Sequence, residues 1–391
     1  MDLRGRRRRE IQTKIETHHK QVSSVSPIIT PQEKERQEQE REERIAMMAR
    51  VAAEFKAEWD KNEAVWRAEA MAMRERIEAG EDPEYVRNYS DLAAQAAEFR
   101  DTWNEMYSPY FGCFEETTKI PNMPFTYKKP GRNQSATTPT TLQIISLKVA
   151  RIRGGLQWPF HVFGMVAIRD MVDHKRNIIF DRPRHCCQIL TQEVPYLQLT
   201  GPTRAIVVDN SVTFEVDLKV KGATESEDEC LSFLAASYTD FFESLKSRLL
   251  KRQYAGKLGT LEFELGSMVY SVEATISVRV TSGSWPDGFR AQFSASTESL
   301  GDAEIILLDS GDDKVPVVGH LGSIKLSRCV VTVESDGLLR FSVKAWKGDD
   351  IVARRKKAFK AKRAGPSVGT LDIGFCTMSV NIAWSLISTW Y

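Results

Sequence analysis

Histidine and cysteine, the residue types that bind zinc, gather at one place in this sequence. His185, Cys186 and Cys187 are consecutive, with His174 upstream and Cys230 downstream. Structural zinc sites pair their ligands at short spacings such as Cys-x-x-Cys, and this chain has no such pair. In a strand, Cys186 and Cys187 would face opposite sides. We therefore predict no metal site and no cofactor.

Aspartates near the ends of expected strands offer the oxygen ligands that calcium prefers. Calcium takes about six to eight oxygens, so several loops would have to meet. Aspartate is also common in turns for backbone reasons alone, which is the interpretation we favour. The candidates are Asp170, Asp173, Asp209, Asp312, Asp313, Asp349 and Asp350.

Sequence patterns for catalysis are missing from the chain. It has no Gly-x-Ser-x-Gly elbow for a nucleophilic serine. It also has neither a phosphate-binding Gly-x-x-x-x-Gly-Lys nor a dinucleotide fingerprint. We predict that the protein is not an enzyme, and keep an uncharacterised enzyme as the third alternative.

Two basic tracts are candidates for binding phosphates or directing nuclear import. The first is Arg6–Arg9. The second contains one aromatic residue, Phe359, and so lacks the stacking platform of single-strand readers. A solvated loop is the interpretation that we favour for this second tract, and binding of RNA is the alternative. Its cations are Arg354, Arg355, Lys356, Lys357, Lys360, Lys362 and Arg363.

An apolar stripe on a long expected helix is the best candidate for binding a protein partner. The helix begins with Thr30 as N-cap and Pro31 in the first turn. Spacings of three and four place the stripe on one helical face, where it favours self-association or a coiled coil with another chain. Packing on the rest of the molecule is the alternative. The stripe includes Ile45, Met48, Phe55, Trp59 and Trp66.

Short segments of alternating apolar and polar residues fill the chain after about residue 140. Residues 212–220 alternate most regularly, which predicts a half-buried antiparallel strand. A helix-like interruption is expected at 239–252, and 335–337 (SDG) predicts a tight hairpin. The expected strands are 142–152, 160–169, 194–199, 204–208, 212–220, 230–238, 260–265, 268–280, 289–295, 303–308, 328–334, 338–346 and 371–386, the last divided near Cys376.

These elements predict a mainly β protein: an antiparallel β-sandwich-like domain preceded by a long α-helical arm. We expect a disordered basic tail at 1–29 and a helical arm of two helices at 30–106, the second starting near Ser90. A linker follows at 107–140, and the all-β domain covers 141–391.

Composition is that of an ordinary soluble protein. Of 391 residues, 42% are hydrophobic, and 54 Lys and Arg nearly balance 53 Asp and Glu, so no overall field attracts a membrane. No apolar run is long enough to span a bilayer, and the N-terminus lacks a secretory signal. We interpret the six cysteines as free thiols, which indicates a reducing compartment. We expect a cytoplasmic or nuclear protein without a membrane partner.

Several segments of the β region resemble a plant, mainly grass, family, domain of unknown function 6598. The resemblance spans about residues 141–388. The segments are 152–159 (IRGGLQWP), 162–170 (VFGMVAIRD), 197–205 (LQLTGPTRA), 220–225 (VKGATE), 271–276 (SVEATI) and 285–289 (WPDGF).

The resemblance implies little chemistry, because the activity of the family is not established. In some cereal proteins a similar domain follows a ribosome-inactivating N-glycosidase domain. Residues 1–140 are too short for that domain and lack its Glu-Ala-x-Arg pattern. A cap-binding role would need two tryptophans around a base, with Trp158, Trp285, Trp346 and Trp384 as candidates.

We therefore expect a non-catalytic protein-interaction module, related to stress or defence, that assembles through the helical arm. The alternative is an RNA- or ribosome-associated protein that uses the basic tracts.

Overall fold

The computed structural model describes residues 39, 46, 83–131, 136–208, 211–239, 246–311, 314–319 and 322–388. From residue 83 onward these residues belong to one compact unit, Lys61–Tyr391. The fold is mainly β, and every strand pair in this part of the chain is antiparallel, as the alternating segments predicted. The basic tail and the stripe Ile45, Met48, Phe55, Trp59 and Trp66 lie outside the described residues.

The first half of the β region forms two sheets around one core. Alternation within each strand sends one set of side chains, including Phe214 and Phe263, into that core, where both are fully buried. One sheet has the order β6-β2-β10-β9 and the other β4-β3-β7-β8, with β5 beside β3. The strands are β2 (Thr141–Ile152), β3 (Phe160–Arg169), β4 (Asn177–Arg182), β5 (Gln188–Leu190), β6 (Ile206–Val207), β7 (Val212–Val220), β8 (Glu229–Tyr238), β9 (Arg248–Ala255) and β10 (Gly259–Met268).

The second half repeats this plan with a second core. Phe293 and Phe341 are among its fully buried side chains. One sheet has the order β14-β15-β11-β20-β19, with β16 also paired to β11, and the other β13-β12-β17-β18. The strands are β11 (Ser271–Gly283), β12 (Phe289–Thr297), β13 (Ile305–Asp309), β14 (Val317–Val318), β15 (Ser323–Ile324), β16 (Val330–Glu334), β17 (Leu338–Lys347), β18 (Asp350–Lys360), β19 (Gly365–Asp372) and β20 (Cys376–Ser385). A separate pair joins β1 (Ala136–Thr137) to β21 (Ile387–Ser388).

One buried arginine connects the two halves. Arg328 is 3% exposed and donates to the carbonyls of Ile144 and Ile145 in β2, both at 2.7 Å, and to that of Ile306 in β13 at 2.6 Å. No carboxylate among the described residues contacts it, and burial lowers its pKa to about 9. The three carbonyl oxygens are therefore what holds its guanidinium between the two sets of sheets.

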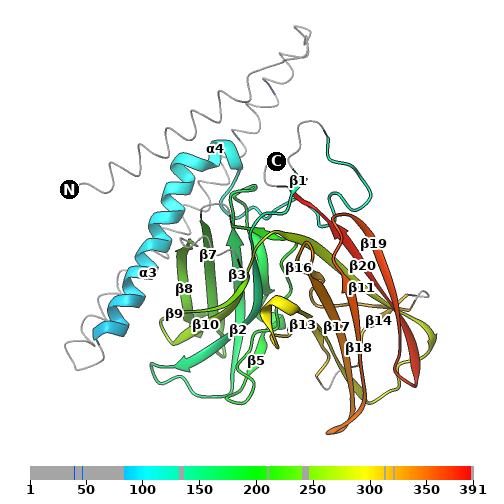
Figure 1. Ribbon diagram of the computed structural model, residues 1–391. Coiled ribbons are helices and arrows are strands. Elements are labelled where there is room, and N and C mark those ends of the chain that lie inside the picture. Colours follow the sequence, from blue (N-terminus) through cyan, green and yellow to red (C-terminus); the bar gives the residue numbers. More distant parts are fainter. Residues whose placement is uncertain are drawn as a thin grey trace. The chain divides into compact units, whose positions relative to one another are not determined.

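A helix lies against the first set of strands (Figure 1). It comprises α3 (Pro83–Thr102), a π-helical turn at Trp103–Tyr107 and α4 (Ser108–Phe111), and α3 contacts β8 and β9. Proline suits the first turn of a helix because its missing N–H has no partner there. The helix was predicted to start near Ser90, which is wrong, because Ser90 lies inside α3. Three short 3-10 turns cover Arg184–Cys186, Glu225–Glu227 and Glu298–Leu300.

Four other local predictions were wrong. Residues 248–252 belong to strand β9, where pairing with β10 overrides the helical spacing of the leucines. Residues 194–199 make only an isolated bridge at Tyr196 instead of a strand. The turn at 335–337 is tight, but β16 and β17 pair with different partners, so it joins two sheets rather than closing a hairpin. The basic tract at 354–363 was expected to be a loop, but residues 354–360 lie in strand β18 and only the last three residues follow it.

Candidate functional site

The strongest concentration of unpaired charge in the described structure lies on and after β18. We call it the basic ridge. All seven of its cationic side chains are exposed, and none lies within 4.0 Å of a carboxylate among the described residues. The ridge comprises Arg354, Arg355, Lys356, Lys357, Lys360, Lys362 and Arg363, the same residues that the sequence analysis selected.

The position of β18 explains why these charges remain free. It pairs with β17 alone and forms the edge of its sheet. Lysine and arginine on an edge strand hinder pairing with another chain, so part of this pattern serves solubility. Phe359 is buried, 6% exposed, which anchors the strand and leaves no exposed aromatic ring on it.

Alternation along β18 divides the ridge into two rows. Ala353 and Phe359 face the core, so Arg354, Lys356 and Lys360 face outward. Side chains two residues apart on a strand are about 7 Å apart. The outward row therefore presents a line of positive charge suited to an extended polyanion.

Neighbouring cations on the same sheet differ from the ridge because acidic residues neutralise them. Lys344, opposite Arg354, is paired with Glu304 at 2.8 Å. Arg340 is paired with Glu298 at 3.1 Å. Most of the free positive charge of this sheet is thus at its edge; the exposed Lys347 at the end of β17 lies against the ring of Phe289.

A buried ion cluster holds the helical segment on the outward face of β3 and β7. Glu215, 6% exposed, accepts hydrogen bonds from Arg169 at 2.9 Å and Arg176 at 3.0 Å. The ring of Phe114 lies 4.3 Å from the guanidinium carbon of Arg169 and 5.0 Å from that of Arg176. Arg100 of α3 approaches the same ring at 4.9 Å. Cation–π contacts therefore fasten residues 100–114 to the sheet.

The charge of Glu215 depends on these arginines. Burial alone would raise the pKa of its carboxyl, but Arg169 and Arg176 outweigh burial, so that the pKa lies below its usual range. The polar face of β7, expected to be solvent-exposed, is thus partly buried. No local pattern indicated this, because the covering residues lie about 100 positions away.

A second buried cluster uses two of the candidate calcium ligands. Arg204 contacts Asp170 at 2.6 Å and Asp173 at 2.9 Å. These carboxylates neutralise an arginine that is 4% exposed, and so they serve the structure. Asp209, Asp312 and Asp313 lie outside the described residues. Across the part of the chain that is described, no group of three His, Cys, Asp or Glu side chains is placed to hold a metal.

The other candidates from the sequence are dispersed. Cys186 ends an exposed 3-10 turn, whereas the prediction of opposite strand faces assumed a strand. Trp158 packs on Phe160, Trp384 is fully buried, and Trp346 lies under Arg290 with 5.2 Å between ring centre and guanidinium carbon. Trp384 therefore has no face open to a base, and Trp158 packs on the first core whereas Trp285 packs on the second.

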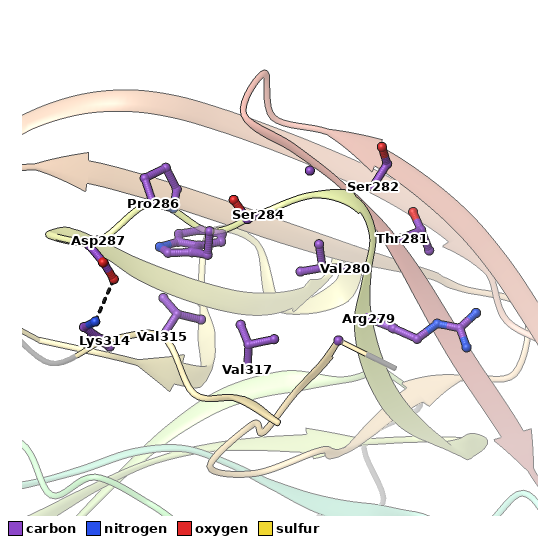
Figure 2. Close-up of a pocket in the computed structure, with 13 residues that line it drawn as sticks. Arg279, Val280, Thr281, Ser282, Ser284, Pro286, Asp287, Lys314, Val315 and Val317 are labelled. Atoms are coloured by element: carbon purple, nitrogen blue, oxygen red, sulfur yellow. Dashed lines mark ion pairs between the residues drawn. The ribbon is translucent and has the colours of Figure 1, made fainter. Parts of the chain in front are cut away.

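Trp285 is one of the residues that line a groove which the sequence analysis did not identify. Figure 2 shows this groove. The groove has a volume of about 680 Å³ and lies between the end of β11, the following turn and residues 314–317. In the sequence, Trp285 and the expected strand at 268–280 could not be connected to the other wall of the groove, because the two walls are about 30 positions apart.

Comparison with known families identifies the β region. Residues 141–382 match the family described as "Domain of unknown function (DUF6598)". The chain belongs to this family. The basic ridge and nearly all of both cores lie within the matched range, which ends just before Trp384 of the second core, whereas the helical segment that Glu215 helps to hold precedes it.

Other comparisons add little. Among solved structures, two C2 domains of extended-synaptotagmin 2, calcium bound, align with 65% of this chain and 98% of theirs at 8% identity and a TM-score of 0.23. Human GIVD cytosolic phospholipase A2 aligns with 65% of this chain and 31% of its own at 10% identity and a TM-score of 0.23. Likeness this low carries no argument. The comparison with curated protein sequences gives no match. Among the described residues no helix is long and apolar enough to cross a membrane.

Proposed function

We propose that this protein is a non-catalytic interaction module and that its basic ridge binds the phosphate backbone of RNA. The observation that carries the proposal is the row of exposed cations on an edge strand without carboxylate partners among the described residues. Phosphates are the ligands that arginine and lysine bind most readily in such a row. With Phe359 buried, the ridge contacts the backbone and not the bases, so binding is independent of sequence.

Two observations support a non-catalytic role. The charged side chains buried deepest in the described structure are used for structural contacts, as in the Glu215 and Arg204 clusters. The ridge itself consists of arginine and lysine side chains, without the acid and nucleophile that catalysis would need beside a base. We further propose, from the resemblance, that the chain is a grass protein, and that each pair of sheets is a β-sandwich.

The ridge is tested by neutralising its outward row. The variant is Arg354→Gln/Lys356→Gln/Lys360→Gln, compared with wild type by fluorescence anisotropy of a labelled RNA 20-mer at 50 mM salt. We expect affinity to fall at least about tenfold, because three phosphate contacts are lost. The matched control, Arg151→Gln/Lys221→Gln/Lys325→Gln, removes the same charge elsewhere. Equal affinity of the two variants contradicts the proposal.

Assembly through residues 30–106 is the second candidate, and it rests on the sequence stripe. Because α3 is fastened to the β region, the deletion that tests it must end before Pro83. We expect light scattering to give an oligomer for the full chain and a monomer for the chain without residues 1–82. The full-length variant Trp59→Ala/Trp66→Ala is expected to weaken the oligomer. Identical masses for all three proteins would exclude assembly through the stripe.

A further inference from the structure

Strand β19 is an open edge of the second set of sheets. Among the described strands it pairs with β20 alone, along all of Gly365–Asp372. Edge strands commonly carry lysine or proline, which hinder pairing with another chain. β19 has no lysine or arginine, its Pro366 is near one end, and Val368 near its middle is 68% exposed. The strand itself therefore does little to prevent a further strand from pairing with it.

The hydrogen bonds of the neighbouring strands decide which groups of β19 face the open edge. In β11 the N–H of Ile276 donates to a carbonyl just before β16, away from β20. Hydrogen-bonded positions alternate along antiparallel strands. Ile382 of β20, opposite Ile276, therefore bonds to the other side, where Ser367 of β19 is its partner. It follows that Val368 and Thr370 direct their N–H and C=O groups to the open edge, where no other described strand pairs with them.

The inner row of the basic ridge lies beside this edge. Ala353 and Phe359 face the core from β18, and Arg355 and Lys357 lie on the same side of that strand. The stem of Lys357 lies against β19, because a Cβ built on Gly369 would be 3.2 Å from the Cε of Lys357. The inner row therefore reaches across the open side of the second core to β19.

A third cation contacts the edge itself. The Nζ of Lys362 donates to the carbonyl of Pro366 at 3.0 Å. Like Arg355 and Lys357, Lys362 has no carboxylate within 4.0 Å among the described residues. Three positive charges without a counter-charge thus flank the open edge, and complementary charge favours an acidic strand there.

We propose that the open edge of β19 binds an extended acidic peptide of a partner protein, which adds to the sheet as a further strand. The backbone groups of Val368 and Thr370 form the hydrogen bonds, as in other cases of strand addition. The side chains of the added strand alternate between two faces. Those on the inner face meet Arg355 and Lys357 and are acidic, whereas those on the outer face lie beside Val368 and are apolar. This site uses the inner row and does not depend on RNA binding by the outward row.

Three synthetic peptides test the full-length protein by fluorescence anisotropy at 50 mM salt. The probe is a labelled peptide in which Glu and Val alternate. One control has Lys in place of Glu, and the other is the acidic peptide with N-methyl groups on its amides, which removes the hydrogen-bond donors and keeps the charge. We expect both controls to bind at least about tenfold more weakly than the probe, because each lacks one of the two kinds of contact.

Variants of the protein test the two halves of the site. Thr370→Pro removes an N–H that faces the open edge and none that bonds to β20, which an edge strand tolerates. We expect it to weaken the acidic peptide at least about tenfold, and the matched control Thr370→Val, which keeps the N–H, less than about twofold. Arg355→Gln/Lys357→Gln is expected to weaken it about tenfold, because both pairings with carboxylates are lost. Circular dichroism of every variant establishes that the fold is retained.

Four results overturn the proposal. The first is no saturable binding of the acidic peptide to wild type below about 1 mM. The second is equal binding of the N-methylated peptide, which tests strand pairing on wild type even if Thr370→Pro does not fold. The third is that Arg355→Gln/Lys357→Gln weakens binding of the RNA 20-mer and not of the peptide, which would assign the inner row to RNA. The fourth is a wild-type dimer in light scattering that the peptide does not dissociate and Thr370→Pro abolishes, which would assign the edge to a second copy of the chain.

Discussion

Glu215 offers a direct test of how the helical segment is held on the β region. Glu215→Gln keeps the shape of the side chain and removes its charge. Arg169 and Arg176, 2.9 and 3.0 Å away, are then left in a buried site without a counter-charge. Removing one partner of a buried ion pair costs about 3–5 kcal/mol, so we expect that loss in the free energy of unfolding.

The measurement is urea denaturation at pH 7, followed by far-UV circular dichroism. Glu298→Gln is the matched control, because Glu298 is 62% exposed and pairs with Arg340 at 3.1 Å. Exposed pairs contribute about 0–1 kcal/mol, so the control should be close to wild type. A difference between the two variants below about 1 kcal/mol would refute the reasoning.

Comparing wild type with Glu215→Gln should also show that the stability of the fold depends on pH. A carboxyl whose pKa is lower in the folded state stabilises the fold above its unfolded pKa, about 4.3 for glutamate. That stabilisation is lost as the pH falls through the folded pKa, which for Glu215 lies below the usual range. Wild type should therefore lose stability below about pH 4 more steeply than Glu215→Gln. Parallel stability curves for the two proteins would contradict this assignment.

Three further predictions concern other parts of the structure. Arg328→Met removes the donor to three buried carbonyls, of which that of Ile144 keeps the side-chain amide of Gln143 at 3.0 Å. At about 1–3 kcal/mol for each of the other two, urea denaturation should show a loss of at least about 2 kcal/mol, and a loss below about 1 kcal/mol would be inconsistent with a bridging role. Gly369→Val should lower the stability by about 1–3 kcal/mol, because a Cβ at this position would lie 2.8 Å from the ring of Phe359; an unchanged melting temperature would show that the ring moves freely. At pH 8 iodoacetamide should modify the exposed Cys186 before Cys376, because burial raises the pKa of the Cys376 thiol to about 11. Mass spectrometry that showed the reverse order would contradict the placement of both thiols.

Alternation predicted the strands whose two faces differ. Residues 160–169 and 212–220 were predicted with the bounds that β3 and β7 have, because one face of each enters a core. The segment 371–386 was expected to divide near Cys376, and a break does lie at 373–375, but β19 begins at Gly365, outside the predicted range.

The edge strands β9 and β18 were not predicted, because at most two of the side chains in each are buried. In β18 only Ala353 and Phe359 are buried, and they lie within a run of cations that is typical of a loop. β9 has leucines at helical spacing, and its hydrogen bonds with β10 decide its conformation. Local sequence does not contain that partner.

The candidate surfaces divide in the same way. The ridge was visible in the sequence because its cations are consecutive in the chain. The groove around Trp285 and the cluster around Glu215 were not, because each needs residues that only the tertiary fold brings together. Arg100, Phe114 and Glu215 span more than 100 positions, and no local pattern connects them.

The dependence of RNA affinity on salt tests the central claim most directly. For single-stranded nucleic acid, the logarithm of the affinity falls with the logarithm of the salt concentration by about 0.7 per neutralised phosphate. With the full-length protein and its ridge variant Arg354→Gln/Lys356→Gln/Lys360→Gln, we predict slopes that differ by about 2. Equal slopes, or no binding by wild type at low salt, would contradict the assignment of the basic ridge as an RNA-binding surface.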